Sequence, residues 1–486
     1  MKLSSWRAAL RIARRDALRA KGRSALVVAM IALPVLGVAG ADVVFRSTGL
    51  EPGERAVRLL GQSDALLTSY GRGMTVMQPP IAGEGGSASM PKDGEKPTPE
   101  QQKSLQTDPG VLALELLPKG SVLTPVLTGH DTTAGSRDGR LRTRTAEADL
   151  TDPIWHGKLD IVQGRAPGAP QELAATRAFL DQAGLEVGST TTVRGLEDRP
   201  YTITAAVEDP GSLDTVELIG RPGALIEPQD KALGQVPRGG RGGVSGGGSW
   251  LVKLPAGAVL DWPKVLELNK YGLVATSRTV VLDPPPRSQV PYYVDQDRRG
   301  GAGSGVDRTA VIMLATVAGM ALLEIVLLAG PAFAVGARRS RRQLGLLAAG
   351  GGDRSHVRAV VLGGGAVLGL AGAAAGVVSA ILLTAATRPW LEETAGRRFG
   401  HLDLRPLDLL GIAALGLVTG LLAAVVPAVQ ASRQNVVEAL TGRGALRPPS
   451  RRPALLGLLM LAGGAALALL GAVGGQGTLA VLGGSV

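Results

Sequence analysis

The sequence predicts an α-helical transmembrane bundle that carries a large extracytoplasmic α+β domain. Five apolar, nearly uncharged stretches predict the bundle, and they lie at 25–41, 309–337, 359–387, 409–429 and 454–473. Each can supply the roughly 20 residues that a helix needs to cross a bilayer core, the first by continuing through Phe45. The interval 46–308 takes up more than half of the 486 residues and predicts the outer domain.

The charges beside these stretches predict their orientation. Residues 1–23 hold eight Lys and Arg against one acidic residue, residues 338–358 six against one, and residues 431–452 five against one. Residues 388–408 hold four Arg and four acidic residues. Because short loops rich in Lys and Arg stay cytoplasmic, we expect a multi-pass protein of the cell (plasma) membrane. Its amino terminus would be cytoplasmic and 46–308 extracytoplasmic.

These observations divide the chain into alternating segments. In order, we expect a cytoplasmic amphipathic segment (1–23), a first span (24–45), the extracytoplasmic domain (46–308), a second span (309–337), a cytoplasmic loop (338–358), a third span (359–387), an outer loop (388–408), a fourth span (409–430), a cytoplasmic loop (431–453), a fifth span (454–473) and an outer segment or the start of a sixth span (474–486). The last segment turns apolar again at Leu479, which favours a truncated product or a fragment.

The net charge of +11 could indicate a nucleic-acid-binding protein, but its distribution excludes this. The three basic segments sum to 19 basic minus 3 acidic residues, or +16, whereas 46–308 has 29 basic and 32 acidic residues. The excess therefore follows the membrane topology, and we expect it to contact anionic membrane lipids and no nucleic acid. The chain has no cysteine, so the outer domain cannot depend on disulfides.

Two features of the amino-terminal region, a small-residue triplet and an upstream apolar pattern, can each be interpreted in two ways. Residues 39–41, Ala-Gly-Ala, resemble a signal-peptidase site. The basic region before them is long and the apolar run is long enough to span, so we favour an uncleaved anchor over a signal peptide. Upstream, Trp6, Leu10, Ala13 and Ala17 recur at helical spacing. This predicts an amphipathic helix on the inner membrane surface, with a solvated basic tail as the alternative.

Within 46–308, alternating and capped patterns predict strands and helices of an α+β domain. The predicted strands are 172–176, 187–194, 201–207, 250–254 and 275–282, with 187–194 and 201–207 as a hairpin. The predicted helices are 177–183, closed by Gly184, and one that Asp261 caps, that runs to Lys270 and that Gly272 ends. Three stretches rich in Gly, Pro, Ser or charge are predicted to lie outside the core: 79–107, 234–249 and 283–308.

The sequence contains no recognisable catalytic motif. The histidines at 130, 156, 356 and 401 have no metal-binding spacing, the glycine-rich stretch 239–248 lacks the Lys-Ser/Thr of a P-loop, and no Gly-x-Ser-x-Gly elbow is present. We therefore expect no enzyme activity in this chain and no catalytic, cofactor or metal site. Any ATP-driven work would need a separate ATPase subunit.

One acidic residue, Glu324, lies midway through the second predicted span. An ionised carboxylate in the bilayer costs a few kcal/mol, so we expect Glu324 to face other helices or to be protonated. A coupling role and a plain helix–helix hydrogen bond both remain open. In the third span, Gly365, Gly369, Gly372 and Gly376 predict close helix packing rather than a ligand site.

The order of several motifs resembles the FtsX-like permease family. Residues 338–350 read RRSRRQLGLLAAG, similar to the family's arginine run, acidic residue, Ile-Gly-Leu-Leu and small-residue turn. Residues 427–440 resemble its closing Pro-Ala through Arg to Pro-Val-Glu-Ala-Leu. Gln343 replaces the usual acid, and Val436 stands where the family often has proline. Outer stretches at 164–167, 171–173, 184–188 and 201–203 resemble the MacB-type periplasmic core.

The resemblance implies a membrane permease subunit of a MacB-type ABC transporter, with a MacB-like periplasmic core domain outside. Such permeases pair with a cytoplasmic ABC ATPase, and many transmit its motion through the helices to the outer domain, in export, extraction or mechanotransmission. Longer relatives carry a second helix block, so the chain would be the N-terminal half of a longer member. It would act as a homodimer or as a pseudo-dimer with a second permease half. The substrate stays open.

In that scheme 338–358 is the cytoplasmic coupling loop. The resemblance implies that Gln343, Leu344, Leu346 and Leu347 dock on the ATPase, since apolar side chains beside a basic rim suit a helix-in-groove contact. A membrane-surface helix is the alternative for this loop. For the whole chain, the alternative is a membrane-anchored sensor or regulator of a cell-envelope process without transport.

Overall fold

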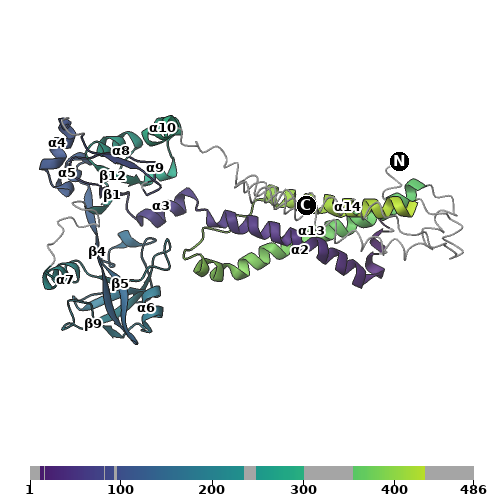
Figure 1. Ribbon diagram of the computed structural model, residues 1–486, viewed down its shortest axis with the longest axis horizontal. Coiled ribbons are helices and arrows are strands. Elements are labelled where there is room, and N and C mark those ends of the chain that lie inside the picture. Colours follow the sequence, from purple (N-terminus) through teal and green to yellow (C-terminus); the bar gives the residue numbers. More distant parts are fainter. Residues whose placement is uncertain are drawn as a thin grey trace, which may run out of the picture. The chain divides into compact units, whose positions relative to one another are not determined.

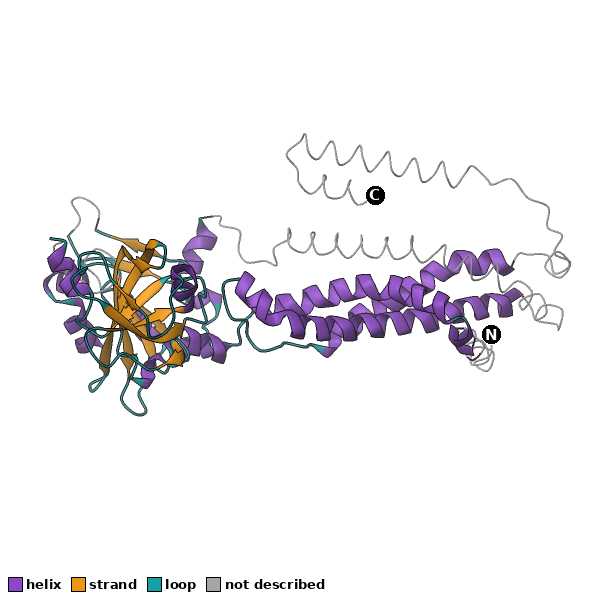
Figure 2. Cartoon of the chain, turned by 90° about the horizontal axis from the view of Figure 1, so that it is seen from below, coloured by secondary structure: helices purple, strands orange, loops and turns teal. Residues whose placement is uncertain are grey.

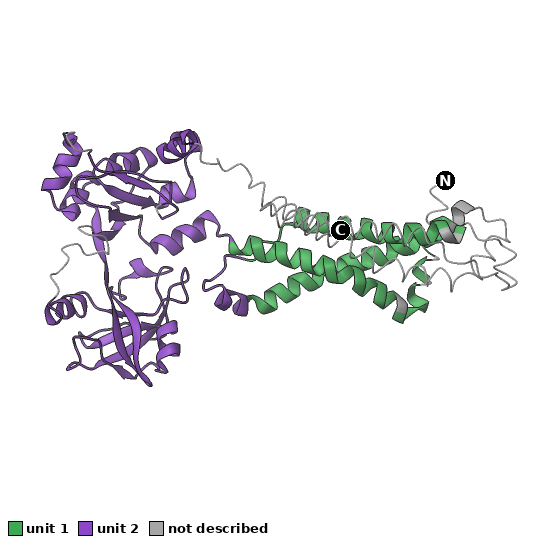
Figure 3. Ribbon diagram, in the orientation of Figure 1, with its two compact units in different colours: residues 1–48, 304–388, 402–486 green, residues 49–303, 389–401 purple. Residues whose placement is uncertain are grey.

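The computed structural model describes residues 11–81, 83–91, 96–234, 248–299 and 354–432, apart from residues 12 and 16. The chain divides into two compact units, which Figure 3 shows in different colours. Unit 1 comprises residues 1–48, 304–388 and 402–486, and unit 2 comprises residues 49–303 and 389–401. Every strand among the described residues belongs to unit 2, and the described part of unit 1 is helical (Figure 2).

Unit 1 is built from long apolar helices. These are α2 (Lys21–Thr48), most of α13 (Arg354–Thr394) and α14 (Pro406–Ser432). Each contains a segment long and apolar enough to cross a membrane, at Ser24–Thr48, Arg358–Thr394 and Pro406–Val429. The predicted spans 24–45, 359–387 and 409–430 fall on these helices. The predicted spans 309–337 and 454–473 lie outside the described residues.

Glycines on α13 allow the helices of unit 1 to approach closely. A Cβ added to Gly372 would lie 2.8 Å from the Cβ of Ile31 on α2, and one added to Gly365 would lie 2.7 Å from a side-chain carbon of α14. Gly376 faces α2 and Gly369 faces α14 in the same way. Any side chain at Gly365, Gly372 or Gly376 would push a neighbouring helix away. The prediction of close packing is therefore confirmed.

The amino-terminal end of unit 1 also packs inward. Residues 39–41 continue α2, and Ala39 is fully buried in the bundle. Ala13 is buried, and Ala17 packs against the bundle core of residues such as Ile31 and Leu368. Trp6 and Leu10, the other members of the predicted apolar face, lie outside the described residues.

The described part of unit 2 is built on one mixed sheet of ten strands. The strand order is β12-β1-β11-β4-β5-β10-β7-β9-β6, and β8 pairs with β9. The pairs β5–β10 and β7–β9 are parallel and the other pairs of this sheet are antiparallel. A separate small sheet contains β2 (Thr75–Met77) and β3 (Ser87–Ser89). The strands of the main sheet are β1 (Ala65–Ser69), β4 (Val122–Ser136), β5 (Gly139–Glu147), β6 (Asp160–Gly164), β7 (Glu172–Thr176), β8 (Thr190–Thr191), β9 (Tyr201–Glu208), β10 (Glu217–Gly220), β11 (Ser249–Lys253) and β12 (Leu273–Ser277).

Unit 2 also contains short helices, several of which pack on this sheet. They are α3 (Pro52–Leu60), α4 (Pro99–Gln106), α5 (Pro109–Leu116), α6 (Arg177–Ala183), α7 (Ile226–Ala232), α8 (Trp262–Asn269), α9 (Arg278–Leu282) and α10 (Pro291–Arg298). Three-residue 3-10 turns occur at Pro153–Trp155 and Arg287–Gln289. Together with the membrane-length helices of unit 1, this mixed unit fits the predicted combination of transmembrane helices and an α+β domain.

Unit 2 has two lobes, and the 15-residue strand β4 runs through both of them (Figure 1). Its first part pairs with β11 in a lobe that includes α5 and α8 and whose core contains Leu67. Its second part pairs with β5 in a lobe that α6 and α7 cover and whose core contains Phe179. The register of β4 on β5 shifts between Thr128 and Asp131. A third apolar cluster around Trp155 contains residues of both lobes and so joins them.

Several predicted elements of unit 2 are confirmed. The predicted strand 172–176 and helix 177–183 are β7 and α6, and Gly184 closes α6 in the left-handed conformation, with φ +64°. Asp261 caps α8 by accepting a hydrogen bond from the Lys264 N–H at 3.1 Å. The predicted strands 201–207 and 250–254 correspond to β9 and β11 within one residue at each end.

Two strand predictions were wrong in part. The predicted strand 275–282 is β12 followed by α9, because β1 pairs with β12 only as far as Ser277. Arg278 then donates hydrogen bonds to the carbonyls of Ser63 and Gly61, at 3.0 and 2.6 Å, which turns the chain into α9. Of the predicted strand 187–194, only β8 is a strand that pairs with β9, because the chain then turns to contact β4 at Ala134.

Two stretches predicted to lie outside the core contribute to it. In 79–107, Gln101 and Ser104 of α4 are buried, and a reciprocal capping box between Thr98 and Gln101 begins this helix. In 283–308, Val290 is fully buried in the first lobe, and α10 follows it. Gly and Pro mark the turns of these stretches, but the prediction overlooked the short helices α4 and α10 between the turns. Most of 234–249 lies outside the described residues.

Candidate functional site

Residues 389–401, between α13 and α14 in the sequence, fold as part of unit 2. The first six of them form the end of α13, and the remainder connect it to Leu402 in unit 1. Helix α13 therefore begins in unit 1 and ends in unit 2. Pro389 removes one backbone hydrogen-bond donor where the helix passes between the units. We call residues 389–401 the anchor segment.

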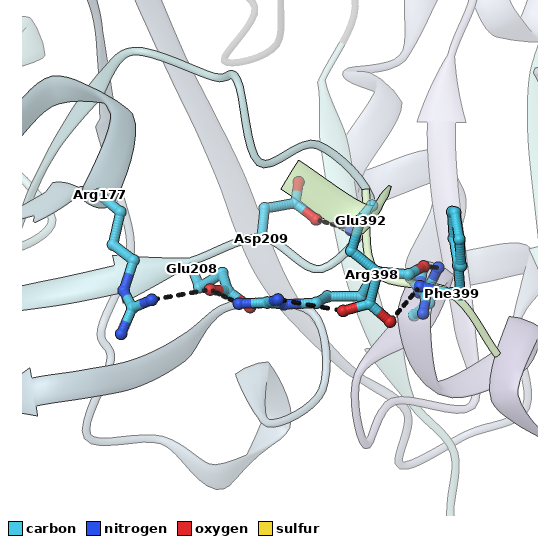
Figure 4. Close-up of polar contacts among 8 residues, drawn as sticks. Arg177, Glu208, Asp209, Glu392, Arg398 and Phe399 are labelled. Atoms are coloured by element: carbon cyan, nitrogen blue, oxygen red, sulfur yellow. Dashed lines mark hydrogen bonds and ion pairs between the residues drawn. The ribbon is translucent and has the colours of Figure 1, made fainter. Parts of the chain in front are cut away.

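Arg398 is the centre of the contacts between the anchor segment and the rest of unit 2 (Figure 4). Its Nε and Nη2 donate to the two carboxylate oxygens of Glu208 at the end of β9, both at 2.8 Å. Its Nη1 donates to Glu392 Oε2 at 3.1 Å, and Arg177 of α6 approaches Glu208 at 3.8 Å. The side chains of Glu208 and Glu392 are only 11% and 7% exposed. Two carboxylates largely removed from water thus share one guanidinium, which binds Glu208 in bidentate geometry and Glu392 through a single hydrogen bond.

Main-chain hydrogen bonds fix the anchor segment around Arg398. The Arg398 N–H donates to the Pro210 carbonyl at 2.9 Å, and the Leu213 N–H donates to the Gly396 carbonyl at 2.8 Å. Arg58 of α3 donates from Nη1 to the Arg398 carbonyl at 2.6 Å. Gly396 has φ +64°, and a Cβ there would collide with the neighbouring loop, so this turn requires glycine.

The end of the anchor segment contacts the start of α3. The His401 N–H donates to Glu54 Oε1 at 2.9 Å, and the His401 imidazole lies 3.5 Å from a carboxylate oxygen of Glu51 and 3.6 Å from one of Glu54. A Cβ on Gly400 would lie 2.6 Å from the Gly49 carbonyl oxygen, so the two backbones are in close contact. Gly49 directly follows α2. The contact therefore joins two points at which the chain passes between units 1 and 2.

Pairing and burial shift pKa values at this site in opposite directions. Hydrogen bonds from Arg398 hold the pKa of Glu208 below its ordinary value, and the pairing raises the pKa of Arg398. Burial raises the pKa of Asp209, whose carboxylate accepts a backbone hydrogen bond at 2.8 Å. Burial lowers the pKa of Lys158, whose Nζ donates to the Leu59 carbonyl at 3.1 Å. The Arg398–Glu208 pair therefore stays ionised at neutral pH.

A cavity of about 330 Å³ lies beside this pair. Its lining comes from the start of α6, the end of β9, the loop 212–214 and the anchor segment, and it includes Arg177, Glu393 and Arg398. Among the residues that the structure describes, no group of His, Cys, Asp and Glu is arranged to hold a metal ion. The arrangement consists of paired charges and main-chain bonds, which hold one part of the chain to another.

The structure does not place the site residues that the sequence predicted. Glu324 and the predicted docking residues Gln343, Leu344, Leu346 and Leu347 lie outside the described residues. From the sequence, Arg398 and Glu392 counted only as members of the balanced charge of 388–408. Their signal was a Glu and an Arg six residues apart at the end of an apolar helix, followed by an aromatic residue that the structure shows to be buried.

The fold and this site first define a class: a membrane protein whose apolar helices carry a large mixed-sheet unit, with the α13–α14 connection built into that unit. Residues 315–436 match the model of the FtsX-like permease C-terminal domain. The chain therefore contains an FtsX-like permease domain, and the resemblance drawn from its motifs is confirmed. The matched range includes α14, the anchor segment and all of α13. The match indicates a permease component of an ABC transporter. A comparison with curated proteins gave no match.

Proposed function

We propose that the chain is the membrane permease subunit of an ABC transporter and couples a separate cytoplasmic ATPase to motion of an extracytoplasmic unit 2. The observation that supports this most directly is the course of α13. This helix leaves unit 1 and ends in unit 2, where Arg398 ties the chain to Glu208 of the main sheet. Movement of the helix would therefore act on the sheet through paired charges and not through a loose loop.

The length of α13 suits this role. It has 41 residues, which corresponds to about 60 Å at 1.5 Å per residue. It begins at Arg354, four residues after the predicted ATPase contact 338–350 ends. A displacement of that contact would reach the anchor segment through a single helix, which resists bending far better than a loop.

The partners follow from the same proposal. The permease family normally works with a cytoplasmic ABC ATPase, and we assign the docking contact on this chain to Gln343, Leu344, Leu346 and Leu347. A second permease half would complete the transporter, as a homodimer or a pseudo-dimer. The amino terminus would be cytoplasmic, and the basic segments would contact anionic lipid headgroups.

The test is co-expression with an ABC ATPase encoded near this chain, followed by co-purification and measurement of ATPase stimulation. Leu346→Asp and Leu347→Asp should each abolish stimulation, because they place a charge in the apolar contact, and membrane insertion should survive. Arg433 and Glu438 variants are the control, since these residues lie on the other cytoplasmic loop.

Two results would overturn parts of the proposal. If pairing persists in both Leu variants and is lost on substitution of Arg433 or Glu438, the docking contact lies after α14. If no ATPase co-purifies with the wild-type chain, a membrane-anchored sensor or regulator without transport becomes the better reading.

A further inference from the structure

The three membrane-length helices α2, α13 and α14 contain only two Phe, Tyr or Trp residues, and both lie at the helix ends that adjoin unit 2 in the sequence. These are Phe45, in the last turn of α2, and Trp390, near the end of α13. Their side chains are 79% and 64% exposed, and Leu407, in the first turn of α14, is 84% exposed. Each helix thus exposes a large apolar side chain at this end. We call these three residues the rim.

Charged residues occur beside each rim residue. Arg46 follows Phe45, and its guanidinium reaches Asp42 at 3.0 Å and Asp408, the residue after Leu407, at 2.7 Å. On α13, an arginine occurs two residues before the rim tryptophan. Because charged side chains avoid the hydrocarbon core of a bilayer, these residues mark where the three helices leave it. The rim residues therefore lie at the boundary between hydrocarbon and lipid headgroups.

The packing of α2 against α13 gives the same boundary on α13. A Cβ added to Gly40 would lie 4.0 Å from Thr384 Oγ1, so these two positions are in contact. The glycine contacts between the two helices advance along both together, so the helices run in the same direction. Arg46 lies six residues after Gly40, and Trp390 lies six residues after Thr384, which is about 9 Å along each helix. The boundary that Arg46 marks on α2 thus corresponds to Trp390 on α13.

The apolar segment of α13 is longer than a bilayer needs. Its candidate span Arg358–Thr394 has 37 residues, or about 55 Å, whereas those of α2 and α14 have 25 and 24 residues, or about 36 to 38 Å. The hydrocarbon core is about 30 Å thick. Because a helix with excess apolar length can tilt or shift in the bilayer, its apolar pattern alone does not fix its depth. A tryptophan at the boundary can fix it, since its ring is apolar and its N–H donates to polar headgroup atoms.

We propose that Trp390 binds phospholipid at the boundary of the headgroup region and thereby fixes the depth of α13 in the membrane. The indole ring contacts the upper part of the acyl chains, and its N–H donates to ester or phosphate oxygens of the lipid. The continuity of Trp390 with an apolar span and the charges beside the rim favour lipid over a protein partner. This lipid contact goes beyond the proposed function, because it requires a membrane and no ATPase.

Anchoring at Trp390 leaves the excess length of α13 at the opposite membrane face. Gly372 of α13 meets Ile31 of α2, as their Cβ separation of 2.8 Å shows. From this contact, Ser24 is seven residues earlier on α2, and Arg358 is fourteen residues earlier on α13. The span of α13 therefore begins about 10 Å beyond that of α2.

Tryptophan fluorescence of the full-length chain in phosphatidylcholine vesicles tests the lipid contact. The chain has five tryptophans, so the emission of Trp390 is obtained as the difference between the wild-type chain and Trp390→Phe. Lipid brominated near the headgroup end of its acyl chains should quench most of this difference, and lipid brominated near the chain ends should quench less. The control is the difference between the wild-type chain and Trp250→Phe. It should not be quenched, because Trp250 packs against the core of the first lobe.

A single nitroxide label tests whether Trp390 fixes the depth of α13. The chain has no cysteine, so Leu383→Cys, at a position that is 50% exposed, provides one labelling site. Adding Trp390→Ala should move the label towards the headgroups, because the long apolar segment can then centre itself in the bilayer. The depth is measured from collisions of the label with oxygen and with a polar nickel reagent. Leu370→Ala, which removes another exposed side chain within the span, should leave the depth unchanged.

The outcomes separate the lipid contact from the transporter proposal. Trp390 emission that neither brominated lipid quenches would place the indole against protein or water and overturn the contact. Stronger quenching by bromine at the chain ends would overturn the boundary, and an unchanged label depth in Trp390→Ala would overturn the anchoring role. A lipid-bound Trp390 in a chain that stimulates no ATPase would support this inference while the proposed function fails.

Discussion

Replacing Arg398 by Met should release the anchor segment from unit 2. The substitution keeps the aliphatic part of the side chain and removes the three hydrogen bonds to Glu208 and Glu392. Two carboxylates that are 11% and 7% exposed would then lose their main cation. Breaking a buried ion pair costs about 3–5 kcal/mol. Arg398 is 29% exposed and Arg177 remains 3.8 Å from Glu208, so we expect about 2–3 kcal/mol here.

Hydrogen exchange of the 389–401 backbone measures this cost directly. A loss of about 2–3 kcal/mol predicts that the segment opens about 30- to 150-fold more often. The matched control is Arg165→Met. Arg165 makes a bidentate pair with Glu172 in the same unit, but its side chain is 64% exposed and it lies outside the anchor segment. This control should leave exchange in 389–401 unchanged.

A third variant separates lost pairing from lost packing. In Arg398→Met combined with Glu208→Gln and Glu392→Gln, no buried carboxylate is left unpaired, so part of the protection should return. The reasoning is refuted if Arg398→Met exchanges like the wild-type chain over 389–401. It is also refuted if the triple variant exchanges faster than Arg398→Met, because the cost would then not come from unpaired charge.

Three further substitutions test other parts of the molecule. Gly365→Val should lower the free energy of unfolding of the bundle by about 1–3 kcal/mol, because its Cβ would meet α14. Gly364→Val, whose Cβ would meet no neighbouring atom, should leave it unchanged. Asp209→Asn should raise Tm by roughly 2–4 °C at pH 7. Because burial raises the pKa of Asp209, ionisation of this carboxyl destabilises the wild-type chain as the pH rises above 3.8. The higher Tm of the Asp209→Asn variant should therefore disappear in melting curves recorded below that pH. Glu324→Gln should still fold and insert, since an amide keeps its hydrogen bonding; a carboxyl group found facing lipid without a polar partner would contradict our placement of Glu324.

Local signals predicted the elements that they define completely. The apolar stretches predicted α2, α13 and α14 because membrane-spanning length is a property of a single segment. The strand–helix pair at 172–183 and the Asp261 cap were predicted because alternation and capping act within a few residues. The glycines of α13 were recognised because small residues at helical spacing have few other uses in a membrane helix.

The sequence patterns did not predict β4 and β5, which form the longest strand pair of unit 2. β4 and β5 share the longest register in the sheet, but β5 presents Arg140, Arg142 and Arg144 on one face and Thr143 and Thr145 on the other. Its inner face is polar, so the alternation of apolar and polar residues is weak. The end of β12 was missed for a different reason. It depends on β1, about 200 residues earlier in the chain, and no local pattern contains that information.

The balanced charge of residues 388–408 has a physical reason beyond topology. We used the balance only to place this loop outside, since a neutral loop gives no cytoplasmic signal. In the structure, Arg398 pairs with Glu392 and Glu208, and Arg405 pairs with Asp403. A loop that folds against a protein surface needs a partner, in the loop or on that surface, for each charge that it buries, since an unpaired buried charge is costly. Acidic and basic residues in the same loop can supply part of this pairing, as Glu392 does for Arg398, and β9 supplies the rest through Glu208.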